Sequence, residues 1–160
     1  MNITKPVRVA HTYTQHLRAS ADHVVPLLCP VREADWIEGW SPSLVITESG
    51  VAERDCMFLT GSGAETAIWV VTEYDPPSGR IEFIKTTPGV TVTRIVIAVR
   101  RDTDSTCTAD ISYQHTALSQ VGEAAVSALT AQQFREFMQT WQDRLNHYLG
   151  TGEMLRSLEA

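Results

Sequence analysis

The four tryptophans are the side chains of this sequence best suited to form a ligand site. Trp36, Trp40, Trp69 and Trp141 each combine a large apolar ring with one N–H donor. Rings that converge on a hollow form an apolar wall with a few polar groups, which is the usual composition of a small-molecule site. We expect such a wall, although ordinary core packing is the commoner role of any single tryptophan.

Two polar aromatic residues lie where a reaction would need them. Tyr113 and His115 alternate with Ile111 on one side of a predicted strand, and the apolar side of that strand should face the interior. An interior histidine can act as a general base, and a tyrosine can donate a hydrogen bond to an oxyanion. Hydrogen-bonded core side chains explain both residues as well. Arg94 would be a further electrostatic stabiliser, but alternation does not decide whether it and Glu73 face the interior or solvent.

Acidic residues gather in a second short segment. Glu33, Asp35 and Glu38 share one predicted helix, and Asp35 and Glu38 are three positions apart. This pair would serve as acid and base if it faced a cleft. Charged residues on a short helix usually face solvent, so we interpret all three as a solvated face.

The histidines and cysteines show no pattern of metal ligands. None of the five histidines and three cysteines forms a ligand pair at the spacing that one helix face requires, so we predict neither a metal site nor a cofactor. Cys29, Cys56 and Cys107 are odd in number, widely spaced and without a CxxC motif. We expect them to be reduced and mostly buried.

Alternating hydrophobicity between recurrent turn signals predicts seven strands. Their expected ranges are residues 7–17, 44–48, 55–60, 66–74, 80–86, 90–99 and 105–117. The connections between the last six are too short to carry crossover helices. Neighbouring strands should therefore pair antiparallel, as a meander.

Two short helices should follow the first strand, and a long one should end the chain. Ser20 is a suitable N-cap for a helix over 21–29, which Pro26 should kink or shorten, and a second helix is expected over 32–37. Apolar residues at steps of three and four predict a long amphipathic helix over 134–149, preceded by a shorter one near 120–129. An antiparallel sheet with helices on one side is an α+β arrangement.

Composition excludes several classes of protein. The 160 residues are 43% hydrophobic and 20% charged, as expected for one folded domain over 1–160 with its core in 7–150. The net charge of −6, with no basic cluster beyond Arg100 and Arg101, argues against a nucleic-acid partner. The longest apolar run has five residues, so we expect no membrane span, no signal peptide and a cytoplasmic location.

The order of these elements, and three segments in particular, resemble a known superfamily. The segments are LCPVREADWIEGW (28–40), TEYDPPSGRIEF (72–83) and LNHYL (145–149). They resemble one bacterial subgroup of the SRPBCC superfamily, which includes START, Bet v 1-like and polyketide cyclase/dehydrase proteins, and the likeness extends over 7–150. The resemblance implies a helix-grip fold, in which a curved seven-stranded antiparallel sheet wraps around a long C-terminal helix.

The resemblance also implies a hollow between sheet and helix, which in many relatives holds a lipid, a sterol or a polyketide-derived ring. We therefore expect an apolar small-molecule ligand. The candidate wall residues are Trp36, Trp40, Trp69, Phe83, Tyr113, His115, Phe134, Met138 and Trp141. The superfamily has no shared catalytic motif, so the fold alone does not give a function.

Two alternatives stay open beside ligand binding. One is a cyclase or dehydratase that uses His115, Tyr113 and Arg94 in the same hollow. The other is a co-chaperone-like interaction module with an exposed apolar patch. A homodimer is common for such folds and is a further expectation.

Overall fold

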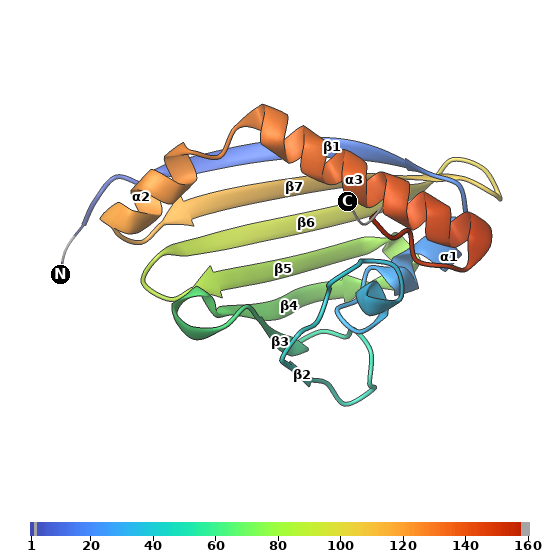
Figure 1. The fold of residues 1–160 in the computed structure, drawn as a ribbon, viewed down its shortest axis with the longest axis horizontal. Coiled ribbons are helices and arrows are strands. Elements are labelled where there is room, and N and C mark those ends of the chain that lie inside the picture. Colours follow the sequence, from blue (N-terminus) through green and yellow to red (C-terminus); the bar gives the residue numbers. More distant parts are fainter. Residues whose placement is uncertain (2, 158–160) are drawn as a thin grey trace.

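A seven-stranded antiparallel sheet forms the body of the fold (Figure 1). The structure is a computed structural model that describes residues 1 and 3–157. The strands are β1 (Arg8–Leu17), β2 (Leu44–Ile46), β3 (Met57–Thr60), β4 (Ala67–Asp75), β5 (Arg80–Thr87), β6 (Thr91–Arg101) and β7 (Cys107–Ala117). Their order in the sheet is β1-β7-β6-β5-β4-β3-β2. The strands β2 to β7 therefore form the predicted meander, and β1 is an edge strand that pairs with β7.

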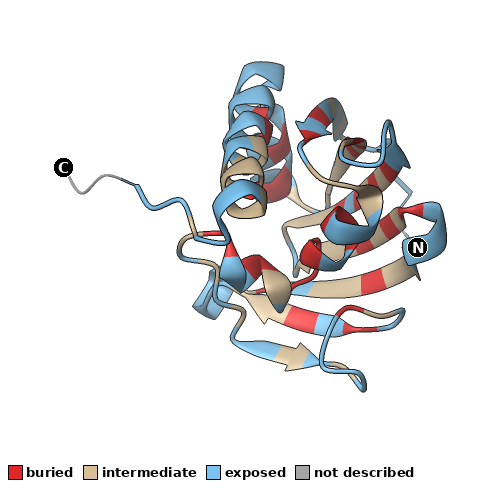
Figure 2. Cartoon of the chain, turned by 90° about the vertical axis from the view of Figure 1, so that its right-hand side faces the viewer, coloured by how far each residue is buried: buried red, intermediate tan, exposed pale blue. Residues whose placement is uncertain are grey.

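Two helices follow the last strand and cover one side of the sheet. These are α2 (Gln120–Ser127) and the 21-residue α3 (Ala131–Thr151). A capping box begins α3, because Thr130 and Gln133 each bond the other's backbone N–H, and Gly152 ends it at φ 73°. The positions of α3 that are coloured as buried lie on the side of the helix turned toward the strands (Figure 2). The predicted α+β helix-grip architecture is therefore confirmed.

The segment after β1 is less regular than the sequence suggests. In place of a helix over 21–29, the chain forms α1 (Ala21–Val24) and a 3-10 turn, η1 (Val25–Leu27), because Pro26 has no N–H to continue an α-helix. The second predicted helix is the 3-10 helix η2 (Arg32–Asp35). Further 3-10 turns lie in loops, at η3 (Gly63–Glu65) and η4 (Pro76–Ser78).

Direct hydrogen bonds join α3 to β1. The buried amide of Gln15 donates to the carbonyl of Met138 at 3.0 Å, and the side chain of Asn146 bonds the backbone of both His16 and Arg18. Buried apolar side chains pack in the layer between sheet and helices, among them Cys56 and Cys107. All three cysteines are free and buried, as predicted.

Gly122 of α2 has no room for a side chain. A Cβ at this position would overlap the carbonyl oxygen of Val90 in the loop between β5 and β6. Since backbone on both sides must shift, we expect Gly122→Ala to lower the free energy of unfolding by about 2 kcal/mol in urea denaturation. Gly150→Ala is the matched control, because nothing lies within 4 Å of that Cβ and alanine favours the helix by about 1 kcal/mol. Equal effects of the two substitutions would contradict the close approach of α2.

Candidate functional site

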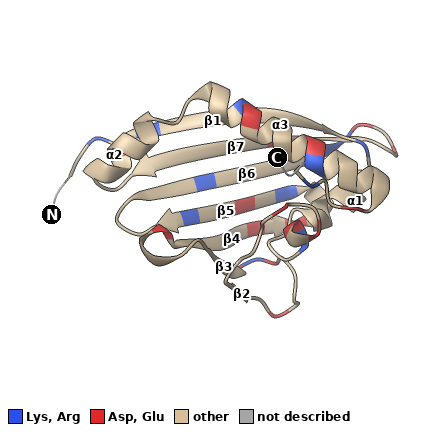
Figure 3. Ribbon diagram, in the orientation of Figure 1, with Lys and Arg blue, Asp and Glu red and all other residues tan. Residues whose placement is uncertain are grey.

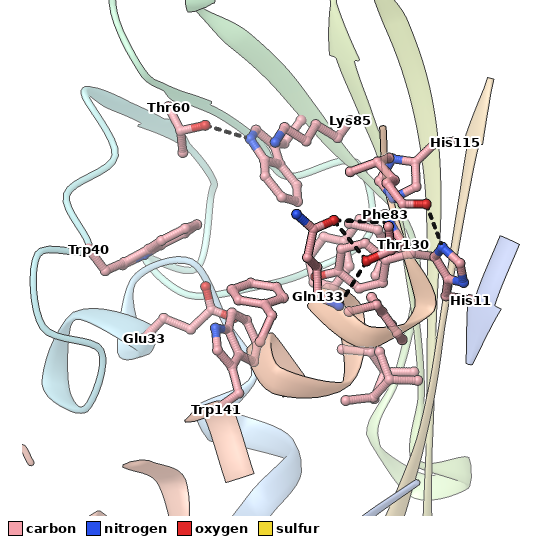
Figure 4. A pocket seen from close by; sticks show the side chains of 18 of the residues that line it. His11, Glu33, Trp40, Thr60, Phe83, Lys85, His115, Thr130, Gln133 and Trp141 are labelled. Atoms are coloured by element: carbon pink, nitrogen blue, oxygen red, sulfur yellow. Dashed lines mark hydrogen bonds between the residues drawn. The ribbon is translucent and has the colours of Figure 1, made fainter. Parts of the chain in front are cut away.

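A cavity of about 620 Å³ lies between the inner face of the sheet and the α2–α3 region (Figure 4). Its volume is in the usual range for small-molecule sites. The apolar part of its lining consists of Trp40, Phe58, Trp69, Phe83, Ile95, Ile97, Ile111, Ala128, Leu129, Phe134, Phe137 and Trp141. The polar part consists of His11, Glu33, Thr60, Lys85, Tyr113, His115, Thr130 and Gln133.

Four aromatic rings from β3, β4, β5 and the η2–β2 loop form one side of the cavity. Trp69 stacks on Phe58 with ring centroids 5.0 Å apart, and Phe83 stands edge-on to both at 6.3 Å. Trp40 approaches Trp69 edge-on at 6.4 Å. The indole N–H of Trp69 donates to Thr60 Oγ1 at 2.8 Å, which fixes the orientation of this ring. These contacts make a rigid, flat-sided aromatic wall.

The register of the sheet explains which side chains reach the cavity, because residues directly opposite on neighbouring strands share a face. One such row runs Trp69, Lys85, Thr93, His115 across β4, β5, β6 and β7. The next row runs Val71, Phe83, Ile95, Tyr113, His11 and ends on β1. The first row therefore contributes the polar side chains of Lys85 and His115 to the cavity, and the second contributes those of Tyr113 and His11 beside the apolar Phe83 and Ile95.

The opposite side of the cavity is formed by α3. Phe134 packs against Tyr113 and His11, with ring centroids 5.3 and 5.5 Å apart. Phe137 lies 5.7 Å from Trp141 and is 46% exposed, so it stands where the cavity meets solvent.

Lys85 brings an amine into this apolar setting. Its Nζ lies 5.0 Å from the centroid of the Trp69 ring, a cation–π distance. Within the described part of the chain, Nζ has no hydrogen-bond acceptor and no carboxylate within 4.0 Å. Burial lowers the pKa of Lys85, because desolvation disfavours the charged form.

Glu33 brings a carboxyl group to the same cavity from η2. The residue is only 6% exposed, and its side chain points into the space (Figure 4). Burial raises the pKa of Glu33 to about 8, so the group is mostly protonated at neutral pH.

Burial also shifts the pKa values of His115 and Tyr113 toward the uncharged form. Burial, and then the positive charges of Lys85 and His11, lower the pKa of His115 to about 4, and its Nδ1 lies 2.8 Å from Thr93 Oγ1. Burial also raises the pKa of Tyr113. At neutral pH the polar groups His115, Tyr113 and Glu33 are therefore mainly uncharged, and Lys85 is the one lysine or arginine among the described residues of the lining.

No protein-family profile matches the sequence, and no curated protein matches it either. Several solved structures, however, are similar to it in fold. A point mutant of norcoclaurine synthase from Thalictrum flavum, in complex with a transition-state analogue, superposes with a TM-score of 0.64 at 12% identity, over 92% of this chain and 99% of that chain. The chain therefore has the same helix-grip fold as this structure.

Two further structures with this helix-grip fold come from biosynthetic loci. The di-domain ARO/CYC protein BexL, from the BE-7585A biosynthetic pathway, gives a TM-score of 0.63 at 16% identity, over 89% of this chain and 46% of that chain. DynU16, from the dynemicin biosynthetic locus, gives a TM-score of 0.59 at 17% identity, over 90% of this chain and 48% of that chain. This chain therefore spans about half the length of each of these two proteins.

The structure brings seven of the nine predicted wall residues of the helix-grip cavity together. They are Trp40, Trp69, Phe83, Tyr113, His115, Phe134 and Trp141. Trp36 and Met138 do not line the cavity: both are 0% exposed, and the indole N–H of Trp36 donates to the carbonyl of Leu27 at 3.0 Å. These two side chains belong to the packed core next to the cavity.

Arg94 lies on the other face of the sheet. Its guanidinium group donates to Glu82 at 2.6 Å, and Arg80 pairs with Glu73 at 2.6 Å, in a partly exposed ladder of charges across β4, β5 and β6 (Figure 3). The hypothesis that Arg94 acts with His115 and Tyr113 is therefore wrong. Its direct neighbours Thr93 and Ile95 are the inward-facing residues.

The acidic segment also differs from the expectation. Glu33 is not on a solvated face, because the tight 3-10 turn of η2 directs it inward while Asp35 pairs outside with Arg32 at 2.6 Å. Glu38 accepts hydrogen bonds from Ser157, so Asp35 and Glu38 do not form a pair in the cavity. Lys85 was not anticipated, although alternation with Ile81 and Phe83 places it on the inner face.

A second hollow of about 630 Å³ lies at the far end of α3. Its wall is polar, and side chains of α3 bond the backbone at the end of β1: Gln142 accepts from the N–H of His16, and Asn146 accepts from the N–H of Arg18 and donates to the carbonyl of His16. These side chains connect α3 to β1, so they have a structural role.

Among residues 1 and 3–157, no three histidine, cysteine or acidic side chains lie close enough together to hold a metal ion. Over the same residues, no helix combines the length and the apolar character that crossing a membrane requires.

Proposed function

We propose that this protein binds an apolar or aromatic small molecule in the cavity between the sheet and α3. The observation that carries the proposal is a 620 Å³ space with twelve apolar side chains in its lining, seven of them aromatic. Such a space is filled most favourably by apolar surface, at about 25 cal/mol for each Å² removed from water. The rigid stack of Phe58 and Trp69 favours flat ring systems of the polyketide type over flexible chains.

We place binding before the cyclase hypothesis because of two residues on which that hypothesis depends. The cyclase hypothesis used His115 as a base, but a histidine with a pKa of about 4 is a weak base at neutral pH. It also used Arg94, which faces away from the cavity. The solved norcoclaurine synthase, which shares the fold, holds a transition-state analogue. The same kind of space can hold a ligand here without the reaction of that enzyme.

Thermal unfolding with and without aromatic compounds tests the proposal. A ligand at a hundred times its Kd adds about 2.7 kcal/mol to the free energy of unfolding. For a chain of this size, that raises the Tm by roughly 5–10 °C. We expect a shift of this order with two- and three-ring aromatic compounds, and native mass spectrometry should show one bound molecule. No shift with aromatic compounds, sterols or fatty acids would refute the proposal.

Phe137→Ala locates the bound compound. Phe137 is exposed at the cavity opening and contributes little to the core, so we expect about fivefold to tenfold weaker binding with almost unchanged stability. Val121→Ala is the matched control, since Val121 is 70% exposed on α2 and outside the cavity. Equal affinity of the two variants, measured by tryptophan fluorescence, would place the compound elsewhere.

A further inference from the structure

Lys85 is the one cationic side chain, lysine or arginine, in the lining of the cavity, among the described residues. The chain has eleven arginines and two lysines, and the other lysine, Lys5, is exposed near the N-terminus. Lys85 points into the cavity from the inner face of β5, beside Trp69 (Figure 4). Its position follows from the sheet register, so the backbone holds it there whether or not a ligand is bound.

The groups around Lys85 do not supply a counter-ion. Trp69 offers only its ring face, because its N–H is bonded to Thr60. Thr93, the cross-strand partner of Lys85, shares its hydroxyl with His115. On the opposite face, Arg80 pairs with Glu73 and Arg94 pairs with Glu82. An amine in this position is stabilised as an ammonium ion only by the weak contact with an aromatic ring.

The carboxyl of Glu33 does not neutralise Lys85 either. No ion pair joins the two groups in the described chain, and Glu33 enters the cavity from η2 rather than from the sheet (Figure 4). A charge left without a partner in an apolar space is unfavourable, and an anionic ligand group would remove that cost.

We propose that the ligand is an aromatic acid whose anionic group is bound by the ammonium group of Lys85, while its rings lie along Trp69 and Phe83. This inference rests on the proposed ligand-binding function and specifies the chemical class of the ligand. A charge-assisted hydrogen bond in a desolvated site contributes more than a neutral one. The acid should therefore bind more tightly than a neutral compound of the same shape.

Matched probes test this directly. Anthracene-2-carboxylic acid and anthracene-2-carboxamide have nearly the same shape and differ in charge at neutral pH, and 2-(aminomethyl)anthracene supplies the opposite charge. We expect the wild-type protein to bind the acid about tenfold more tightly than the amide, and the amine more weakly than the amide. Energy transfer from the tryptophans to anthracene gives the Kd values.

Lys85→Met tests whether Lys85 is the source of the preference. We expect this variant to lose the preference, so that acid and amide bind with equal affinity, and binding of the amide shows that the variant is folded. Lys5→Met should keep the full preference for the acid. Lys85→Gln replaces Lys85→Met if methionine prevents folding, and the same equal affinity is expected.

Each outcome separates the two proposals. If the amide binds and the acid binds no better, the inference about an acid is wrong while ligand binding stands. A preference for the acid that persists in Lys85→Met and Lys85→Gln also overturns the inference. If none of the three anthracenes binds, and no other aromatic compound, sterol or fatty acid binds either, the proposed function itself fails.

Discussion

Trp36→Ala is expected to lower the free energy of unfolding by about 3–5 kcal/mol, the usual cost of removing a large core side chain. Trp36 is 0% exposed, and its ring meets that of Trp141 edge-on at 5.3 Å. The substitution also removes the donor to the carbonyl of Leu27, at 3.0 Å, which lies in the 3-10 turn after α1. An unfilled space and an unpaired carbonyl therefore arise together in the segment that covers one end of the sheet.

Trp40→Ala is the appropriate comparison, because Trp40 makes a similar bond to a backbone carbonyl, that of Pro30 at 2.7 Å, but is only half-buried on the cavity wall. Its ring already borders empty space, so its removal leaves fewer lost contacts and should cost about 1–2 kcal/mol. Urea denaturation followed by circular dichroism measures both values. Equal costs for the two tryptophans would show that the distinction between core and cavity wall is wrong.

The contrast between these tryptophans shows what hydrophobic pattern predicts and what it does not. Strand alternation correctly placed Tyr113 and His115 on the inner face of β7, because a period of two leaves only two choices and Ile111 decides between them. The apolar stripe of α3 likewise predicted that Phe134 faces the sheet. Pattern alone did not separate residues that fill the core from residues that border a space, since both are apolar.

Pattern left the face of Arg94 undecided and misplaced Glu33, for different physical reasons. Arg94 alternates with Val92 and Val96, but β6 carries apolar residues on both faces, so alternation there does not distinguish inside from outside. Glu33 lies in a 3-10 turn of four residues, which is too short to show a periodic pattern. Its direction depends on how the indoles of Trp36 and Trp40 bond to the preceding turn, and that is a tertiary contact.

Lys85 is a third case. The alternation of β5 predicts that it faces inward, but a lysine is not usually expected on an inner face. Ile81, Phe83 and Lys85 alternate along β5, so the strand itself directs the lysine inward. A single lysine at the end of such a series normally extends its amine to solvent. Here the aromatic rings of β3 and β4 extend beyond it, and Lys85 remains half-buried against Trp69.

Glu33→Gln is expected to change how stability depends on pH by several kcal/mol. The folded-state pKa of Glu33 is about 8, raised by burial, whereas an unfolded chain has the ordinary value of 4.5. Below pH 4.5 the carboxyl is protonated in both the folded and the unfolded state, so its ionisation does not change the free energy of unfolding. As the pH rises from 4.5 to 8, only the unfolded state releases the proton, so the wild-type protein loses up to about 1.4 kcal/mol per pH unit relative to the glutamine variant.

The measurement is the difference in unfolding free energy between wild type and variant at pH 5 and pH 8. We expect this difference to change by on the order of 3–4 kcal/mol in favour of Glu33→Gln at pH 8. His115 acts in the opposite direction. Its pKa is about 4 in the folded protein and 6.5 in an unfolded chain, so it lowers the free energy of unfolding as the pH falls below 6.5. That contribution is common to both proteins and cancels in the difference.

Glu48→Gln is the control, because Glu48 is exposed and should leave the pH dependence unchanged. A difference between wild type and Glu33→Gln that stays constant from pH 5 to pH 8 would mean that the carboxyl of Glu33 is solvated or paired in the folded protein. The cavity would then contain a second ionised group at neutral pH. Its negative charge would partly neutralise the field of Lys85 and weaken the preference for an acidic ligand, so the two experiments constrain each other.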